Sequence, residues 1–320
     1  MRLTSVSAAV CALALTGALP AFAQRFPFEK TFDASSPATL DVSTIRGKIE
    51  IAAGDPGKIV VSGGVTVRVG LSIPADAVAI AQRIAGAPPI ERDGATIRLR
   101  PPADPAERRA VTVNYIVRVP PDTTVRTVSE SGATTVRGVA GALDVRTQSA
   151  AIEIDSAGGA TIVTSGSGSI RVVRAGSSLR VRTQSGKVDA TLTGQGDVDV
   201  RTGSSAITLH GVRGGLMVDT QSGRVTLGGR PGHDWTVTTG SSAVTVEVES
   251  GAAFSVDARS RSGSVAVDGP LQGSTDKRMV SGKINGGGPT VRITTGSGAI
   301  RLRGPSGRQP LTVLFLLLTE

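Results

Sequence analysis

A short repeat of about 18 residues constrains the fold of this chain more than any other feature. One unit, residues 179–188, reads LRVRTQSGKV. Apolar and charged residues alternate in it with a period of two, which indicates a half-buried β-strand, and Gln-Ser-Gly then forms a corner before the next strand. Such units cannot bury their apolar face alone and must stack on one another. The repeat therefore predicts an all-β fold, a parallel β-solenoid with repeats of about 18–19 residues.

The spacing of the units follows from the apolar residue after each corner. These residues recur at intervals of about 16–21 positions, most of them close to 18 or 19. With strands about 4.8 Å apart, this stack would be a rod about 40 Å long. The aligned residues are Ile152, Ile170, Val188, Ile207, Val225, Val244, Val265, Ile284 and Ile300.

Hydroxyl residues recur before the corners. Because equal slots stack vertically in a solenoid, we expect these side chains to form ladders that bond along the stack. They occupy the fifth slot (Thr147, Ser165, Thr183, Thr202, Thr220, Thr239) and the seventh slot (Ser149, Ser167, Ser185, Ser204, Ser222, Ser241) of successive units.

The slot between the two hydroxyls alternates between glutamine and glycine. This gives a superperiod of two units and leaves the coil length open. Each unit forms one coil with two kinds of corner in alternation, which we favour, or two units form one larger coil. The alternating residues are Gln148, Gly166, Gln184, Gly203, Gln221 and Gly240.

Residues 1–23 match a secretory signal peptide. Arg2 precedes an apolar run, and Ala21-Phe-Ala23 is a small-residue cleavage site, so we expect export, cleavage after Ala23 and a periplasmic or cell-surface location. The single cysteine, Cys11, lies in the apolar run, so the mature chain would have no disulfide and no cysteine-based site. We expect no transmembrane segment, because no stretch approaches the roughly 20 apolar residues that a spanning helix needs.

Residues 24–320 are predicted to form a single β-solenoid domain in three parts. Residues 24–120 would be an N-terminal cap with irregular coils and one short helix/loop insertion near 71–110. Regular repeats would follow over 121–305. Residues 306–320 would close the C-terminal end.

Two features detail the N-terminal part. Phe26, Phe28 and Phe32 lie close together and predict a plug over the open end of the solenoid, with a partner-docking patch as the alternative. In the insertion, the alanine-rich residues 74–84 predict a helix, and residues 86–95 and 101–109 predict loops on either side of a short strand.

The C-terminal residues 310–318 are apolar but too short to span a membrane. We expect them to form a closing strand on the last coil. Docking of a partner and a sequence artefact remain open as alternatives.

The chain is basic, with a formal charge of +9 that falls to +8 without Arg2. The outward slots carry both signs and are open to two interpretations. One is a solvated face with ion pairs between coils, each worth about 0–1 kcal/mol. The other is an anion-binding surface that attracts acidic polysaccharide, lipopolysaccharide phosphate or an anionic membrane, formed by Arg171, Arg174, Arg180, Arg182 and Arg201.

Catalytic, cofactor and metal sites are not predicted. The two histidines, His210 and His233, lack carboxylates at a consistent spacing, and no nucleophile-elbow, phosphate-loop or recurrent aspartate motif occurs. Aromatic residues make up 2% of the chain, so we expect no nucleic-acid partner, since single strands stack their bases on aromatic side chains.

Several motifs together resemble a bacterial family. They are the early strand residues 45–51 (IRGKIEI), the strand 115–120 (YIVRVP) and the repeated V-x-T-x-S-G-x-I/V units. The sequence is similar to a large family of exported repeat proteins of unknown function labelled "putative adhesin". The resemblance covers most of residues 30–305 and implies a β-solenoid outside the cytoplasm, with no catalytic residues. The 71–110 insertion and the apolar tail depart from it.

We therefore predict a non-enzymatic extracytoplasmic binding or scaffolding protein, adhesin-like at the cell envelope. Its partner would be an acidic envelope glycan or another envelope protein. The alternatives are a polysaccharide-active β-helix enzyme with a carboxylate pair and an envelope-stress accessory protein that binds another protein. The sequence leaves the ligand, the coil handedness and the oligomeric state undetermined.

Overall fold

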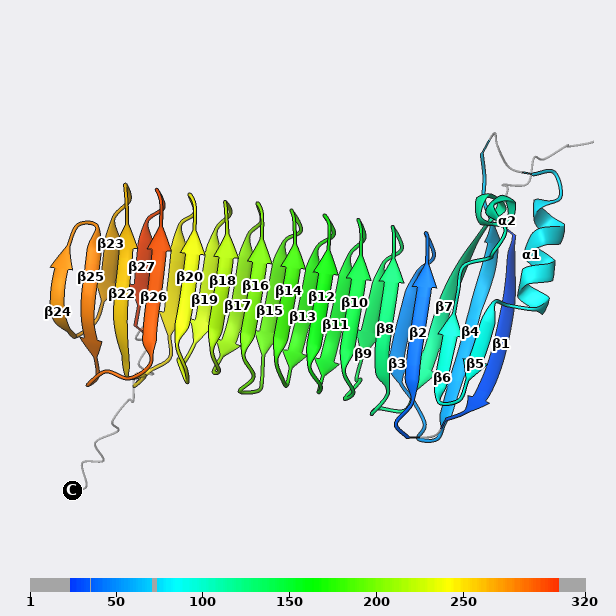
Figure 1. Cartoon of the computed structure of the whole chain (residues 1–320), viewed down its shortest axis with the longest axis horizontal. Coiled ribbons are helices and arrows are strands. Elements are labelled where there is room, and N and C mark those ends of the chain that lie inside the picture. The colour runs from blue at the N-terminus through cyan, green and yellow to red at the C-terminus, as the bar shows by residue number, and fades with distance from the viewer. Residues whose placement is uncertain (1–23, 35, 71–73, 305–320) are drawn as a thin grey trace, which may run out of the picture.

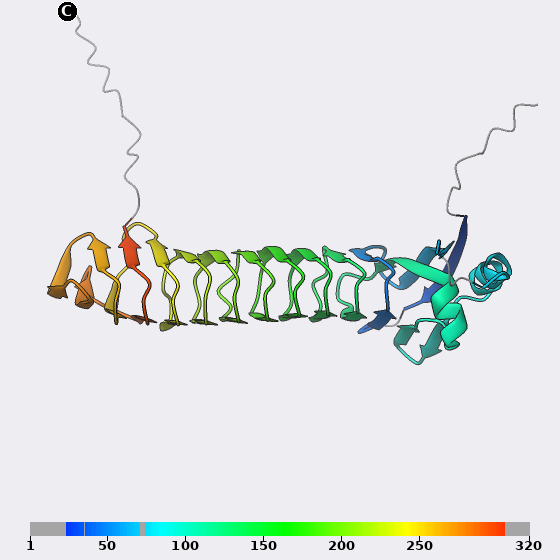
Figure 2. The ribbon, with the colours of Figure 1, turned by 90° about the horizontal axis from the view of Figure 1, so that it is seen from above.

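The computed structural model describes residues 24–34, 36–70 and 74–304. They form a long rod of two β-sheets that lie face to face (Figure 1, Figure 2). Each repeat unit adds one parallel strand to each sheet: Leu143 pairs with Thr161 in one sheet, and Ile152 pairs with Ile170 in the other. This confirms the parallel β-solenoid, with one repeat unit per coil.

Sheet A has 13 strands among the described residues. Its spatial order is β1 (Arg25–Asp33), β4 (Lys58–Val67), β7 (Val111–Val119), β3 (Ile49–Ala53), β9 (Thr134–Arg137), β11 (Ile152–Ala157), β13 (Ile170–Ala175), β15 (Val188–Leu192), β17 (Ile207–Val212), β19 (Val225–Gly229), β21 (Val244–Val248), β27 (Ile300–Arg303) and β23 (Val265–Asp268).

Sheet B has 14 strands within the same described ranges. Its order is β24 (Leu271–Asp276), β25 (Met279–Ile284), β22 (Phe254–Ser260), β26 (Thr290–Thr295), β20 (Trp235–Thr239), β18 (Leu216–Thr220), β16 (Val198–Thr202), β14 (Leu179–Thr183), β12 (Thr161–Ser165), β10 (Leu143–Thr147), β8 (Thr124–Ser129), β2 (Thr39–Thr44), β6 (Thr96–Leu99) and β5 (Ile90–Asp93).

The core lies between the sheets and follows the period-two alternation. Alternate strand residues such as Val145, Val181 and Val200 are buried, and the residues between them face outward. Trp235 is fully buried, and its indole Nε1 donates to the Gly214 carbonyl over 3.0 Å. Because each buried Val, Leu or Ile contributes about 1.5–3 kcal/mol, this continuous core can hold the stack together without crosslinks.

The insertion contains more regular structure than predicted. The expected helix is present as α1 (Ala77–Gly86), and a second helix, α2 (Pro105–Ala110), and strand β5 replace the loops expected over 101–109 and 86–95. The Asp104 carboxylate caps α2 by accepting from the Ala106 amide over 2.8 Å, and Pro105 fits the first turn. We had interpreted this proline as a loop signal, which was wrong because proline is also favoured at helix starts.

The N-terminal phenylalanines lie on an edge strand. β1 pairs antiparallel with β4, which pairs antiparallel with β7, so sheet A continues past the last parallel coil. Phe28 is buried and packs edge-to-face on Tyr115, with 6.0 Å between the two ring centroids. Phe26 and Phe32 pack against the core. Helix α1 covers β4 and β1 at this end (Figure 2). The end is thus closed by antiparallel strands and a helix, and the three phenylalanines of the predicted plug lie on the outermost strand of sheet A.

The C-terminal coils do not stack in chain order. β27 lies between β21 and β23, and β26 lies between β20 and β22, so the coil made last along the chain is inserted one place inward (Figure 1). Ile284, aligned above with the stacked residues, belongs to β25, which pairs antiparallel with β22 in sheet B. That alignment was wrong because residues 271–284 form a hairpin whose length imitates one repeat.

The fifth-slot hydroxyls mostly bond within their own corner. Ser165 Oγ accepts from the Gly168 amide over 2.9 Å and donates to its carbonyl over 3.1 Å, and Thr183 Oγ1 accepts from the Gly186 amide over 3.0 Å. Bonding along the stack also occurs: Thr183 Oγ1 donates to the Gly166 carbonyl over 3.4 Å, and Thr44 Oγ1 donates to Ser129 Oγ over 3.3 Å. Within the corner, the hydroxyls accept from amides three residues on, as in other Ser/Thr turns.

Candidate binding groove on sheet B

A shallow groove of about 830 Å³ crosses the outer face of sheet B at the carboxyl ends of its strands. It runs across the coils from β8 to β18, perpendicular to the strands. Three arginines from outward strand positions line it: Arg146 on β10, Arg182 on β14 and Arg201 on β16. Polar corner residues form its other side, and two carboxylates, Glu130 and Asp219, belong to the lining at its two ends. The groove is therefore open and polar and crosses several coils.

The alternation of glutamine and glycine corners makes this side of the groove uneven. A Cβ atom on Gly166 would lie 2.4 Å from the Gln148 carbonyl oxygen, and one on Gly203 would lie 2.7 Å from that of Gln184. The backbone carbonyl of the preceding corner thus leaves no room for a Cβ at these positions, and a Cβ on Gly296 would likewise lie 2.3 Å from the Gly240 carbonyl oxygen. Exposed glutamine side chains stand as ridges, and the glycines form notches between them.

Asp199 gathers three arginines on this face. Arg182 binds it with two hydrogen bonds, Nη2 to Oδ2 at 2.8 Å and Nη1 to Oδ1 at 3.0 Å. Arg180 Nε and Arg201 Nε lie 3.6 and 3.5 Å from its two oxygens. The arginines come from adjacent strands β14 and β16, so the stack itself brings them together. One carboxylate faces three guanidinium groups, which leaves two net positive charges.

The carboxylate responds to the arginine cluster (Arg180, Arg182 and Arg201 around Asp199). Partial burial alone would raise the pKa of Asp199. The hydrogen bond and charge of Arg182, with the charges of Arg201 and Arg180, outweigh burial and hold that pKa below its ordinary value. Asp199 is therefore ionised across the neutral range.

The five arginines predicted as one anion-binding surface lie on opposite faces of the rod. Arg180, Arg182 and Arg201 share sheet B, whereas Arg171 and Arg174 lie on β13 of sheet A. The prediction of one surface was wrong because a one-unit coil sends consecutive strands to different sheets. Arg174 has a left-handed backbone (φ 55°), and its Nε donates to Ser156 Oγ over 2.9 Å.

Sequence reasoning missed two contributors to the groove. The predicted anion-binding surface does not include Arg146, which pairs with Asp144 on its own strand at 2.8 Å. The corner glutamines were used for the superperiod and not as ligand-facing groups. Their stacking in one column, visible once the unit equals one coil, is the signal that could have identified them.

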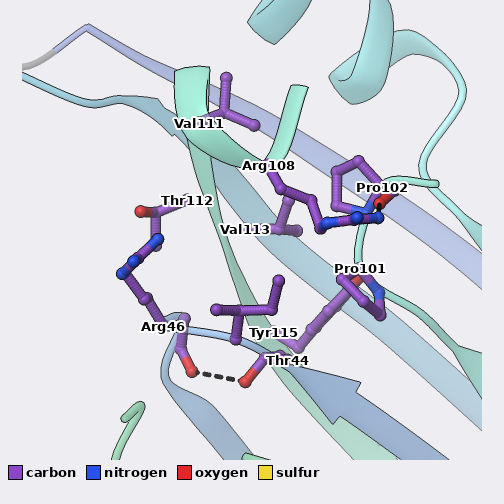
Figure 3. A pocket seen from close by; sticks show the side chains of 11 residues that line it. Thr44, Arg46, Pro101, Pro102, Arg108, Val111, Thr112, Val113 and Tyr115 are labelled. Carbon is purple, nitrogen blue, oxygen red and sulfur yellow. Dashed lines mark hydrogen bonds between the residues drawn. The ribbon is translucent and has the colours of Figure 1, made fainter. Parts of the chain in front are cut away.

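A small cavity at the N-terminal end is structural in character. It holds about 20 Å³ between Thr44, Pro101, Val113 and Tyr115 (Figure 3). Arg108 lies beside Pro102 there, and its Nη1 donates to the Pro102 carbonyl over 2.9 Å. Burial raises the pKa of Tyr115, whose hydroxyl donates to the Arg100 carbonyl over 3.0 Å. A cavity of this size has room for about one water molecule.

The described residues contain no group of three or more His, Cys, Asp or Glu side chains that could hold a metal ion. Of the two histidines, His233 has its Nδ1 3.7 Å from Asp197 Oδ1, and both side chains are three-quarters exposed. His210 lies exposed on β17 of sheet A. Neither histidine faces the groove lining on sheet B.

Comparison with known protein families gives a match over residues 109–303, to the family described as Toastrack DUF4097. The match spans more than half of the chain. The chain belongs to this family. The Toastrack match begins in α2 and ends at the last residue of β27, so it contains every regular coil from β8–β9 onward and the inserted C-terminal coil. No curated protein matches the chain.

Solved structures similar to this Toastrack protein are distant. One is a "putative cell adhesion protein" from Clostridium sporogenes, with 10% identity, 87% of this chain and 99% of that chain covered, and a TM-score of 0.21. A "putative adhesin" from Bacteroides fragilis has 8% identity, 87% and 96% coverage and a TM-score of 0.35. A "putative lipid binding protein" from Parabacteroides distasonis has 8% identity, the same coverage and a TM-score of 0.27. Similarity at this level carries no information on function.

Within the described part of this Toastrack chain, neither helix has the length and apolar character needed to cross a bilayer. The predicted signal peptide and the apolar C-terminal segment lie outside the described residues.

Proposed function

We propose that this protein is a non-enzymatic binding module that holds an extended anionic ligand, an acidic glycan, along the groove of sheet B. The observation that carries the proposal is the arginine cluster, in which three guanidinium groups share one carboxylate. Guanidinium groups bind carboxylate, sulfate and phosphate with paired hydrogen bonds. The excess of positive charge is therefore suited to an anionic ligand.

The shape of the groove supports a polymer. Glutamines line it on every second coil, and arginines line it on β10, β14 and β16, so an elongated ligand could meet similar groups several times along the rod axis. Glutamine amides both donate and accept hydrogen bonds, as sugar hydroxyls require. Aromatic side chains are missing from the lining, so the contacts with sugar would be polar.

An adhesin-like role at the cell envelope fits this binding chemistry and is part of the proposal. It depends on export, which is supported only by the pattern of residues 1–23. Cell fractionation followed by N-terminal sequencing of the mature protein tests export, with Gln24 as the expected first residue. Retention of residues 1–23 in a cytoplasmic fraction would contradict it.

Binding to polygalacturonate tests the ligand class, with neutral dextran as the comparison polymer. We expect residues 24–320 to bind polygalacturonate and not dextran. The affinity should fall as ionic strength rises from about 10 to 150 mM, because the Debye length shortens from about 30 to 8 Å. Arg201→Ala should weaken binding by about tenfold at low salt, the worth of one hydrogen bond to a charged group.

Two further variants make the test specific. Asp199→Asn removes the carboxylate that the arginines share, so it should bind polygalacturonate more tightly than the wild type. Arg171→Ala removes an exposed arginine from sheet A and should leave binding unchanged. Equal losses in Arg201→Ala and Arg171→Ala would show a response to net charge alone and would refute the groove.

A further inference from the structure

The inserted C-terminal coil changes the order of the corner residues that stack beside sheet B, one from each coil. From Gln148 to Gly240, glutamine and glycine corners alternate. Beyond Gln221, the corners in spatial order are Gly240, Gly296 and Arg261: the Gly296 amide donates to the Thr239 carbonyl over 3.2 Å, and the Arg261 amide donates to the Thr295 carbonyl over 3.1 Å. Two glycine corners therefore lie side by side, although they are far apart in the chain.

These adjacent glycines open a wider notch. A groove of about 740 Å³ lies over Gly240 and Gly296, where no corner side chain projects. Exposed hydroxyl residues Thr294, Ser297 and Ser262 line it, and Arg259 and Arg261 stand at its outer side. We call this the double-glycine notch. It lies beyond β18, outside the groove that Arg182 and Arg201 of the arginine cluster line.

The notch is positively charged. Asp257 pairs with Arg259 at 2.9 Å and with Arg292 at 3.6 Å, so one carboxylate is again shared. Arg261 is exposed and has no ion-pair partner within the described residues. The Ser260 amide donates to the Arg278 carbonyl over 2.9 Å, which brings the Lys277–Arg278 turn beside the notch. The lining itself includes no carboxylate.

We propose that the double-glycine notch is a separate binding site for an oxyanion carried by a sugar, such as a sugar phosphate. Arg261 and Arg259 would bind the oxyanion. A guanidinium presents two parallel N–H groups that can donate to two oxygens of one oxyanion. The hydroxyls of Thr294, Ser297 and Ser262 would bind the sugar, as each can donate and accept. The missing side chains of Gly240 and Gly296 provide the space for it.

Amide NMR of residues 24–320 titrated with glucose 6-phosphate tests the site, because the Gly240 and Gly296 signals report on it locally. We expect both signals to shift on titration. Arg261→Ala should weaken the apparent affinity by about tenfold or more. Ser297→Tyr should also abolish the shifts, because it fills the notch without a change of charge.

Arg301→Ala is the matched control. Arg301 is exposed on β27, which belongs to the same coil as Gly296 but lies in sheet A, on the opposite face of the rod. It should bind like the wild type. Equal weakening in Arg261→Ala and Arg301→Ala, or the absence of shifts at Gly240 and Gly296, would overturn the proposal. Inorganic phosphate should bind more weakly than the sugar ester, and equal affinity would refute the sugar contacts. Arg201→Ala should leave these shifts unchanged, which separates this site from the groove.

Discussion

At the scale of single residues, Asp199 organises the charge on the outer face of sheet B. Without it, Arg180, Arg182 and Arg201 would repel one another on adjacent strands. With it, they are held at fixed positions and still carry a net positive charge. The same arrangement, with two arginines, recurs at Asp257. One shared carboxylate thus reduces the repulsion between neighbouring arginines and leaves the outer face of sheet B positively charged at these positions.

Asp199 should make stability depend on pH. Its pKa is lower in the folded chain than the ordinary value of 3.8, so the ionised carboxylate stabilises the fold above that value. This contribution is lost as pH falls through the folded-state pKa. We expect Asp199→Asn to lower the melting temperature by roughly 2–4 °C at pH 7. The difference from the wild type should shrink as the pH falls below 3.8.

Thermal unfolding followed by circular dichroism at neutral and acidic pH checks this. Asp268→Asn is a suitable control, because Asp268 is exposed and makes no ion pair in the described part of the chain. A difference between Asp199→Asn and the wild type that stays constant down to strongly acidic pH would contradict the assignment.

At the scale of elements, the corners decide how coils fit on one another. At most corners the hydroxyl before the corner accepts from the amide three residues on, which satisfies that backbone donor. Thr202 Oγ1 has no hydrogen-bond partner among the described residues. The residue after the hydroxyl is glycine where the backbone carbonyl of the preceding corner leaves no room for a Cβ, as at Gly203 and Gly296. This contact between neighbouring corners is a packing rule for the coils.

Replacing a corner glycine should be costly. In Gly203→Ala the new Cβ would lie 2.7 Å from the Gln184 carbonyl oxygen, which belongs to the backbone and cannot turn aside. We expect the free energy of unfolding to fall by about 1–3 kcal/mol, as for other overpacked sites. Denaturant unfolding measures it. Gln184→Ala, an exposed change in the same column, should stay within about 0.5 kcal/mol. Equal effects of the two substitutions would disprove the packing rule.

At the scale of the whole molecule, the stacking order departs from the chain order at the C-terminal end. After β21 the chain passes over one coil position: β22 and β23 form the outer coil, and β26 and β27 then fill the position against β20 and β21. The hairpin of β24 and β25 continues sheet B beyond the last coil with antiparallel strands. Antiparallel strands thus close the rod at both ends.

Engineered disulfides can test this order. Thr238 pairs with Thr294, and Thr294 pairs with Arg259, so Thr238 and Arg259 are two strands apart. Neighbouring Cα atoms at about 4.8 Å suit a disulfide, and atoms about 9.6 Å apart do not. The double substitution Thr238→Cys with Thr294→Cys should crosslink under mild oxidation, and Thr238→Cys with Arg259→Cys should not. Non-reducing electrophoresis or mass spectrometry reads the result.

No natural cysteine can form a competing disulfide in this measurement, because the single cysteine of the sequence, Cys11, precedes the mature chain that we predict. Crosslinking of Thr238→Cys with Arg259→Cys in preference to the other pair would mean that the coils stack in chain order, which would remove the double-glycine notch.

What the sequence by itself determined is the architecture of the regular coils. Alternation with a period of two decides which side chains are buried, and the spacing of corners decides the repeat length, because both depend only on neighbouring residues. These local rules identified Ile152, Ile170 and Val188 as apolar positions of the stack and placed Gln148 and Gly166 at corners.

Only the tertiary structure decided which residues share a face and which coils are neighbours. Arg171 and Arg182 are close in the chain but lie on opposite sheets, and Gly240 and Gly296 are far apart in the chain but stack directly. The physical reason is that every coil offers nearly the same apolar surface and strand edges, so local pattern does not specify the stacking partner. The order at the C-terminal end, and with it the double-glycine notch, follows from how the whole chain packs.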